Sequence, residues 1–444
     1  MDRKIQTSLI TKTLAVAITA AMASTVQAAS TEQQQIQELR QEVQALKALI
    51  QQQQQVQQQQ QVQIQQVQAQ PAPAAKSASP FSLKSKGGAE VNLYGFVRGD
   101  ANYIVEGADN DFNSVHTSTG AAKDKLRATP KTTRLGLDFS SPVGDRKVGG
   151  KVEVDFAGTN DALRIRHAYL TLDNWLLGQT TSNFLSNHAP EMIDFGTNVG
   201  GGTTRIPQVR YSHKLAPATQ LLVSAEEGNS SAQAHQVDAN GQIVLDDDDK
   251  PVTTGSNVTY RLPVLTAKLT QGFAEGKGAA SARALVEHYK AESGDDKTGW
   301  GVAAGAHYQV AEPLKVSADV SYVQGNSNYL YGSNSAFYVN PENGDIEQNE
   351  FTAFQVGATY KFAPNLRSTL GYGAIFADDG NDYARLNADN VNVNKEVYQA
   401  WLNFIYSPVK PVDLGIEYIN GERETFAGNK FKDNRFGVMA RYNF

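Results

Sequence analysis

The sequence predicts an all-β protein: a transmembrane antiparallel β-barrel of about 16 strands, preceded by an α-helical coiled-coil segment. Three observations predict this fold. From about residue 90 onward, segments of roughly ten residues alternate apolar and polar side chains, as expected when one face of each strand touches lipid and the other touches water. Short and long connections alternate between these segments. A glutamine-rich heptad pattern precedes them.

The composition excludes several classes of protein. The 444 residues include no cysteine, which excludes disulfides, cysteine-based zinc sites and cysteine nucleophiles. No run of about 18 or more apolar residues follows the N-terminal region, which excludes a helical membrane protein. A barrel passes that test because only every second residue faces lipid. The 18 Tyr and 18 Phe, against 4 Met, favour strands and aromatic girdles over a helical core.

Residues 1–28 have the features of a cleaved secretory signal peptide. Arg3 and Lys4 precede the apolar stretch 14–23, and residues 26–28 (Val-Gln-Ala) supply the small side chains that a signal peptidase reads. A short anchoring helix is the alternative, but the apolar stretch is too short to span a bilayer. Removing residues 1–28 takes away a net charge of +2, so the net charge changes from −6 to −8. This negative charge argues against nucleic acid as a partner.

Residues 29–68 are predicted to form a coiled coil beneath their glutamine-rich composition. The two core positions of the heptad hold Ile36, Val43, Ile50 and Ile64, and Leu39, Leu46 and Val67. Disorder is the alternative for a glutamine-rich tract, but a phase kept across the polar residues favours helices. β-branched residues at the first position favour two chains, while core glutamines leave that number open. Residues 69–89, rich in Pro, Ala and Ser, predict a linker.

The barrel is expected over residues 90–444, with sixteen strands that run alternately up and down. Strands that lead from short turns to long loops are expected to begin near residues 91, 148, 174, 217, 280, 313, 366 and 411. Strands that return are expected to begin near residues 131, 162, 205, 263, 299, 350, 395 and 431. Short turns at one end and long loops at the other are typical of outer-membrane barrels, and this number of strands leaves a water-filled lumen.

Residues 435–444 show the alternation most clearly. One face of this predicted strand carries Phe436, Val438, Ala440, Tyr442 and Phe444, and the other carries Arg435, Gly437, Arg441 and Asn443. A strand of this kind suits the closing strand of a barrel, although a soluble sandwich is an alternative. Aromatic residues also gather at the ends of the predicted strands, where a membrane girdle would lie: Tyr103, Phe139, Trp175, Trp300, Tyr360 and Phe362.

The segment 183–204 follows the fifth predicted strand and is expected to fold into the lumen as a constriction loop. Its glycines at 200–202 and its acidic residues Glu191 and Asp194 suit a loop that presses against the inner wall. An ordinary surface loop is the alternative.

Six arginines are expected to line the channel and bind solute: Arg98, Arg134, Arg164, Arg166, Arg205 and Arg210. They lie on the first, second, fourth and sixth predicted strands, so they could form one basic wall. Fixed guanidinium groups bind carboxylates through two hydrogen bonds and draw anions through a pore. The alternative is that these arginines pair with luminal acids such as Glu153 and Asp155 and have no role in substrate binding.

No pattern indicates a metal, cofactor or catalytic site. The seven histidines make no metal-binding motif. The acidic run 246–249 could bind a divalent cation, but a solvated loop tip is the simpler interpretation. A barrel enzyme, a lipase or a protease, is the alternative function. Asp378 and Asp379 are nearest to a catalytic pair, but no histidine is near them in the sequence.

The order of these parts resembles that of DcaP-type porins. The resemblance rests on the signal peptide, the heptads, the linker and the segment 91–98 (VNLYGFVR), together with 163–169, 175–179 and 207–211. It covers essentially the whole mature chain. It implies a homotrimeric, sixteen-stranded channel surrounded by bacterial outer-membrane lipid, with its coiled coil in the periplasm. The solutes implied are small anions, dicarboxylates above all, bound by the arginine-bearing segments. A general structural porin or a cell-wall tether is a further alternative.

Deletion of Phe444 is expected to reduce assembly of the barrel. The terminal aromatic residue is the group that an insertion machinery would grip in barrels of this kind. The amount of folded, heat-modifiable protein in isolated outer membranes should therefore fall, as measured by electrophoresis with and without heating. Normal amounts after the deletion would contradict the role given to this residue.

The segment 31–68 is expected to form helices that associate, and the linker should make it dispensable for the channel. An isolated peptide of this segment should show helicity by circular dichroism that rises with peptide concentration. A protein that begins near Pro80 should still conduct ions. A random-coil spectrum across the whole concentration series would indicate disorder instead.

Overall fold

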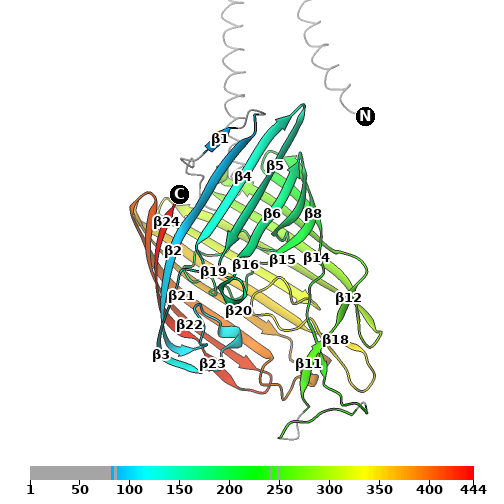
Figure 1. Cartoon of the computed structure of the whole chain (residues 1–444). Helices are drawn as coiled ribbons and strands as arrows, with labels where there is room; N and C mark the ends of the chain where they lie inside the picture. The colour runs from blue at the N-terminus through cyan, green and yellow to red at the C-terminus, as the bar shows by residue number, and fades with distance from the viewer. Residues whose placement is uncertain (1–81, 85–87, 241, 248–250) are drawn as a thin grey trace, which may run out of the picture. The chain divides into compact units, whose positions relative to one another are not determined.

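The computed structural model describes residues 82–84, 88–240, 242–247 and 251–444 (Figure 1). The predicted signal peptide (1–28), the coiled coil (29–68) and most of the linker (69–89) lie outside these residues and stay predictions. Within the linker range, β1 (Ser82–Lys84) pairs antiparallel with the start of β2 (Glu90–Gly107). Residues 82–84, near the end of the predicted linker, therefore form a short strand.

Sixteen long strands form the wall of a barrel in the described part of the chain. In chain order they are β2, β4 (Arg134–Val143), β5 (Arg146–Asp155), β6 (Arg164–Leu172), β7 (Trp175–Thr181), β8 (Arg205–Ala216), β9 (Thr219–Glu226), β13 (Val264–Phe273), β14 (Gly278–Ala291), β15 (Asp296–Ala311), β16 (Leu314–Gln324), β19 (Glu350–Ala363), β20 (Leu366–Ala377), β21 (Asn394–Val409), β22 (Val412–Thr425) and β24 (Asn434–Asn443). Each predicted strand start lies within about three residues of an observed one. The prediction of a sixteen-stranded barrel is confirmed.

The barrel closes because its first and last strands pair with each other. Every strand of the wall is antiparallel to its neighbours, and β2 pairs with β24 in a register that sets Phe96 opposite Asn443 and Tyr103 opposite Phe436. At its other edge β2 pairs with two consecutive pieces of chain, β3 (Ala122–Thr129) and β4. Closure gives each of the sixteen strands a neighbour at both edges, which a sheet surrounded by lipid requires.

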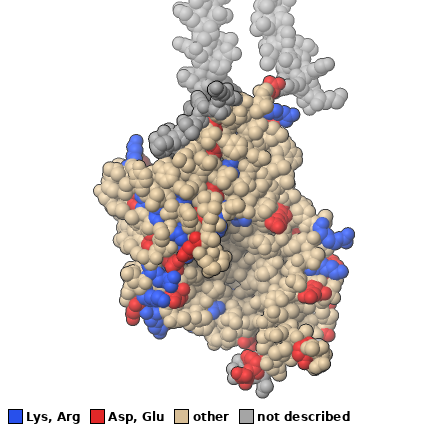
Figure 2. All heavy atoms as spheres, viewed as in Figure 1, with Lys and Arg blue, Asp and Glu red and all other residues tan. Residues whose placement is uncertain are grey.

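The outer wall is apolar and the inner wall is polar. On β24, Phe436 and Val438 are 55% and 51% exposed, whereas the alternating residues Arg435, Gly437 and Met439 are buried. This alternation follows the pleat of the strand and agrees with the two faces predicted for residues 435–444. Figure 2 shows that most of the visible wall carries no charged side chain and that charged groups gather mainly toward its lower rim.

Aromatic side chains meet across neighbouring strands on the outer wall. The rings of Trp175 and Tyr211 lie 4.8 Å apart between centroids, and those of Trp300 and Tyr322 lie 5.4 Å apart. Trp175, the first residue of β7, and Trp300, near the start of β15, are both exposed, which agrees with the predicted girdle.

The long loops carry most of the remaining regular elements, and η3 (Ala274–Gly276) lies in the short turn between β13 and β14. Four short strands from two loops form a separate sheet in the order β11-β10-β17-β18, and β10 and β17 pair in parallel. The remaining short elements are β10 (Ala232–His235), β11 (Thr253–Ser256), β12 (Val258–Tyr260), β17 (Phe337–Val339), β18 (Ile346–Gln348), β23 (Lys430–Lys432), α3 (Asp382–Leu386) and the 3-10 helices η1 (Val115–Thr117), η2 (Thr159–Asp161) and η3 (Ala274–Gly276). Among the described residues, no helix has the length and apolar character needed to cross a membrane.

Candidate functional site

The segment 183–204, called the inner loop below, lies inside the barrel. Near its start, Lys268 of β13 donates a hydrogen bond from Nζ to the carbonyl oxygen of Leu185 at 2.6 Å. Near its end, Gln355 of β19 donates from Nε2 to the carbonyl oxygen of Val199 at 3.0 Å. The loop thus contacts inward-facing side chains of strands far apart around the wall.

The middle of the inner loop is held through Glu191. Its carboxylate accepts two hydrogen bonds from Arg367 of β20, at 2.8 and 2.7 Å. Its carbonyl oxygen accepts hydrogen bonds from Nε1 of Trp401 and Nδ2 of Asn403, both on β21 and both at 3.0 Å. These four hydrogen bonds fix the position of this residue on the wall.

Asp194 and Glu417 hold the next turn of the inner loop. Glu417 of β22 accepts hydrogen bonds from the backbone N–H groups of Ile193 at 2.9 Å and Asp194 at 2.8 Å. The Asp194 carboxylate accepts from the backbone N–H groups of Asn113, in the loop after β2, and Gly196, at 2.9 and 2.7 Å. Burial raises the pKa of Asp194 to about 6, although Arg435 and the two N–H donors act in the opposite direction.

Glycines make room for the inner loop. A Cβ atom on Gly357 or on Gly415 would come within 2.6 Å of the side chain of Pro190 or Ile193, respectively. A Cβ on Gly373 would overlap the carbonyl oxygen of Val199. The predicted glycines of the loop itself behave in the same way, since a Cβ on Gly200 would overlap the carbonyl oxygen of Phe354. The loop and the wall therefore pack so closely that no side chain fits at these glycines.

Four of the six predicted arginines form one cluster, called the arginine cluster below: Arg134, Arg164, Arg166 and Arg205. Arg164 donates two hydrogen bonds to Asp155, at 2.9 and 2.7 Å. Arg166 bridges Glu153 at 2.8 Å and Asp155 at 2.9 Å, and Arg134 lies 3.4 Å from Glu153. Pairing with these two acids, the alternative considered from the sequence, therefore holds for three of the six arginines.

Arg205, the first residue of β8, differs from the other members of the arginine cluster. Among the described residues no acidic group lies within ion-pair distance of it, and its buried Nε, like that of Arg134, has no hydrogen-bond partner. The charged groups that act on it most strongly are Arg166, Arg134, Arg164 and Glu153. Four guanidinium groups thus face two carboxylates, which leaves an excess of two positive charges in the cluster.

The other two predicted arginines lie apart from this cluster. Arg98 is only 2% exposed, pairs with Asp100 on its own strand and donates to the carbonyl oxygen of Ile193 at 2.6 Å. Its guanidinium group also lies 4.5 Å from the ring centre of Phe195. Arg210 donates to the side chain of Gln208 and to a backbone carbonyl of β7. The six arginines therefore do not form one wall, and Arg98 holds the inner loop.

Several inward-facing cations were not predicted as site residues from the sequence, although Arg435 and Arg441 were placed on the polar face of the last strand. They are Lys268, Arg283, Arg367, Arg423, Arg435 and Arg441. Each occupies an inward position of its strand, so the period-two pattern could have identified them. The pattern does not reveal their partners: Arg283 pairs with Asp319 at 2.6 Å, whereas Lys268 contacts only uncharged oxygen atoms among the groups described.

A pair of histidines lies where the inner loop meets the wall. His188 of the loop and His307 of β15 face each other, with 2.9 Å between their Nδ1 atoms. Burial lowers the pKa of His188 to about 3, helped by nearby cationic groups, so this ring is neutral near pH 7. Within the described ranges, no group of three or more His, Cys, Asp or Glu side chains is placed to hold a metal ion.

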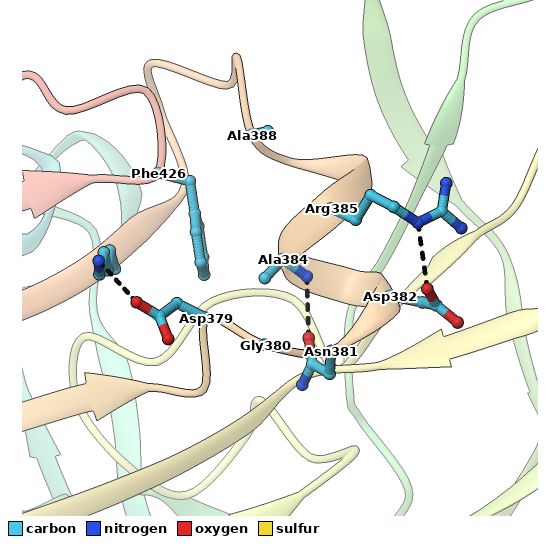
Figure 3. Close-up of a pocket in the computed structure, with 9 residues that line it drawn as sticks. Asp379, Gly380, Asn381, Asp382, Ala384, Arg385, Ala388 and Phe426 are labelled. Atoms are coloured by element: carbon cyan, nitrogen blue, oxygen red, sulfur yellow. Dashed lines mark hydrogen bonds and ion pairs between the residues drawn. The ribbon is translucent and has the colours of Figure 1, made fainter.

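A separate pocket of about 350 Å³ lies in the loop between β20 and β21 (Figure 3). Its charged residues are already paired: Lys395 lies 2.7 Å from Asp379, and Arg385 lies 3.1 Å from Asp382. The ring of Phe426 faces the pocket. None of its lining residues belongs to the predicted site.

A closed sixteen-stranded barrel with an apolar outer wall, a charged lumen and a loop folded inside defines an outer-membrane porin, which is a channel and not an enzyme. The chain belongs to the DcaP outer membrane protein family, whose profile matches residues 15–444. The outer membrane channel DcaP of Acinetobacter baumannii is 63% identical, with a TM-score of 0.74, over 82% of this chain and 99% of that chain.

Two more distant structures share the fold alone. OmpT of Vibrio cholerae is 14% identical, with a TM-score of 0.52 over 82% of this chain and 99% of its own. An anion-selective porin from Comamonas acidovorans is 13% identical, with a TM-score of 0.52 over 80% of this chain and 100% of its own. No curated protein sequence matches the chain.

Substitution of Gly373 by Ala is expected to raise the single-channel conductance. The added methyl group would overlap the Val199 carbonyl, so the inner loop must move away from the wall. Overpacking of this kind costs about 1–3 kcal/mol, which is enough to displace a loop while the barrel stays closed. Planar bilayer recordings in potassium chloride measure the effect.

The matched control is Gly99→Ala on β2, where no atom lies within 4 Å of the added Cβ. This variant should conduct as the unmodified protein does. Equal conductance in both variants would show that the inner loop does not limit the current.

Proposed function

We propose that the protein forms a water-filled, anion-preferring channel through which small negatively charged solutes diffuse, dicarboxylates above all. Membership in the DcaP family supports the channel. The resemblance of the arginine-bearing segments to DcaP-type porins supports the dicarboxylates. The inner loop acts in this proposal as the constriction, with Glu191 and Asp194 holding it against the wall.

The observation that carries the anion preference is the charge of the arginine cluster. Glu153 and Asp155 neutralise only two of its four guanidinium groups, and Arg205 has no acidic partner among the residues described. An anion that passes the cluster meets an attractive potential, and a cation meets a repulsive one. In a pore bounded by a low-dielectric wall, such fixed charges set selectivity.

Within the arginine cluster, some guanidinium groups can contact a solute and others act only through their charge. Arg164 is 45% exposed on its side chain, so its guanidinium group is accessible to a carboxylate in the lumen. Arg166 is only 9% exposed and acts from behind through its charge. A dicarboxylate can engage Arg164 with one end and Arg205 with the other, whereas a monocarboxylate engages one of them. The doubly charged solute should therefore bind more tightly.

We also propose that the protein is a homotrimer in the bacterial outer membrane, with the coiled coil of residues 29–68 in the periplasm. The resemblance to DcaP-type porins supports the trimer, while the heptads leave two or three chains open. A contact between the coiled coil and the cell wall is compatible with this arrangement. A structural porin without selectivity is the competing proposal, and ion selectivity distinguishes the two.

Neutralising Arg205 with the Arg205→Gln substitution is expected to weaken the block of ion current by succinate about fivefold. A hydrogen bond to a charged group contributes about 1.5–3 kcal/mol at most, and water in the pore moves the value to about 1 kcal/mol. The reversal potential across a salt gradient should shift toward cations. Planar bilayer recordings give both quantities.

Arg261→Gln is the matched control, because Arg261 is an exposed residue that follows β12 in a long loop. It removes the same charge and should change neither quantity. Equal effects of the two substitutions, or a cation preference of the unmodified channel, would contradict the role of the arginine cluster and leave the barrel unaffected.

A further inference from the structure

We infer that residues 325–336, called the latch loop below, pack on the end of the inner loop and hold Arg205 in the position from which it binds solute. The latch loop follows β16 and precedes β17. This inference rests on the proposed channel function and deepens it. It names what positions the member of the arginine cluster that has no acidic partner among the residues described.

The start of the latch loop lies against the inner wall. Asn326 is buried and donates from Nδ2 to Oε1 of Glu287, a buried residue of β14, at 3.0 Å. Tyr329 is also buried and donates from its hydroxyl group to Oε2 of Glu226, at the end of β9, at 3.0 Å. Two carboxylates on different strands of the wall therefore fix this part of the latch loop.

The latch loop also contacts the last residues of the inner loop. Tyr331 donates its backbone N–H to the carbonyl oxygen of Gly201 at 2.7 Å. A Cβ on Gly202 would overlap a backbone carbonyl of the latch loop. Thr204 donates from Oγ1 to the carbonyl oxygen of Asn328 at 2.6 Å. The end of the inner loop is therefore held by backbone contacts and by one side-chain hydrogen bond.

The hydrogen bond of Thr204 links the latch loop to Arg205, the next residue. Arg205 begins β8 and pairs with Thr181 of β7. The carbonyl oxygen of Thr204 accepts from the backbone N–H of Ser182 at 3.3 Å, so the chain just before Arg205 is held by β7 on one side and by the latch loop on the other. No acidic group of the described residues fixes the guanidinium group. The position of this charge therefore depends on the backbone that carries it.

The latch loop carries no charge of its own. Residues 325–336 consist only of Gly, Asn, Ser, Tyr, Leu and Ala. A neutral loop does not attract a dicarboxylate through charge, so its effect on such a solute must pass through a charged group that it positions. Thr204 and the latch loop thus have a positioning role, and the contact with the solute belongs to Arg205.

Thr204→Val tests this role, because it removes the hydroxyl group and keeps the size of the side chain. Loss of a neutral hydrogen bond should weaken the block of ion current by succinate about threefold. Single-channel conductance in potassium chloride without succinate should not change. Thr254→Val, at an exposed threonine of β11, is the matched control and should leave both quantities as they are in the unmodified channel.

A double substitution shows whether the latch loop acts through Arg205. Thr204→Val added to Arg205→Gln should weaken the block no further, because the charge that the latch loop positions is already absent. A further loss of about threefold in the double variant would overturn the positioning role, and so would an unchanged block in Thr204→Val. A change in conductance as large as the change in block would also overturn it, since the latch loop would then only shape the pore.

A second measurement reports the latch loop without any solute. The protein contains no cysteine, so an introduced thiol is the only one. Leu330→Cys places a thiol at a buried position of the latch loop, where it should react slowly with a maleimide and faster once Thr204→Val is added. Thr254→Cys is exposed and should react fast in both backgrounds. If Leu330→Cys does not fold, as judged by heat-modifiable electrophoresis, Ser335→Cys near the other end of the loop replaces it.

The two measurements separate this inference from the proposed function. A block by succinate that Arg205→Gln leaves unchanged would contradict the proposed function, and the labelling rates would still show whether Thr204 holds the latch loop. Labelling of Leu330→Cys as fast as that of Thr254→Cys, or at a rate that Thr204→Val does not change, would overturn the inference about the latch loop.

Discussion

The constraint on which this structure depends is the absence of water around the outer wall. Backbone N–H and C=O groups in lipid must find partners within the protein, and a sheet does so only when its edges meet. The pairing of β2 with β24 provides that closure, and the register that places Tyr103 opposite Phe436 fixes it. Closure then separates two environments, because alternate residues face lipid and lumen. The apolar outer wall and the polar inner wall are therefore the two faces of the same strands.

A wall of sixteen strands encloses more space than its own side chains fill. Loops that fold into the lumen occupy part of the rest. Most inward-facing charges pair with one another, as Arg283 and Asp319 do, because an unpaired charge beneath a loop is costly. The inner loop is packed against the wall at glycines such as Gly373. The arginine cluster departs from this pattern, since its cations outnumber its acids. The selectivity proposed here follows from that imbalance.

The fold was predictable because the signals that define it lie within short stretches of sequence. Period-two alternation is visible within each segment, and the lengths of turns and loops are visible between segments, so sixteen strands and their order could be derived. The site was predictable only in part. The pattern correctly placed Arg164 and Arg166 on one face of a strand, and it named Glu153 and Asp155 as partners. It could not show that Arg98 lies under the inner loop, because that contact joins residues 95 positions apart. The partners of Glu191 are even more distant in the sequence, and no local pattern identifies them.

The hydrogen bond between Asp194 and Glu417 also bears on the order in which the molecule folds. It joins residues 223 positions apart, and the contact between Glu191 and Arg367 spans 176. Contacts of this separation cannot form until the intervening chain has been arranged, and forming them costs loop-closure entropy. The lumen must therefore stay unfilled while the strands from β8 to β22 assemble around it. The last part of the protein to reach its final place is its centre, and a nascent barrel is wider inside than the finished one.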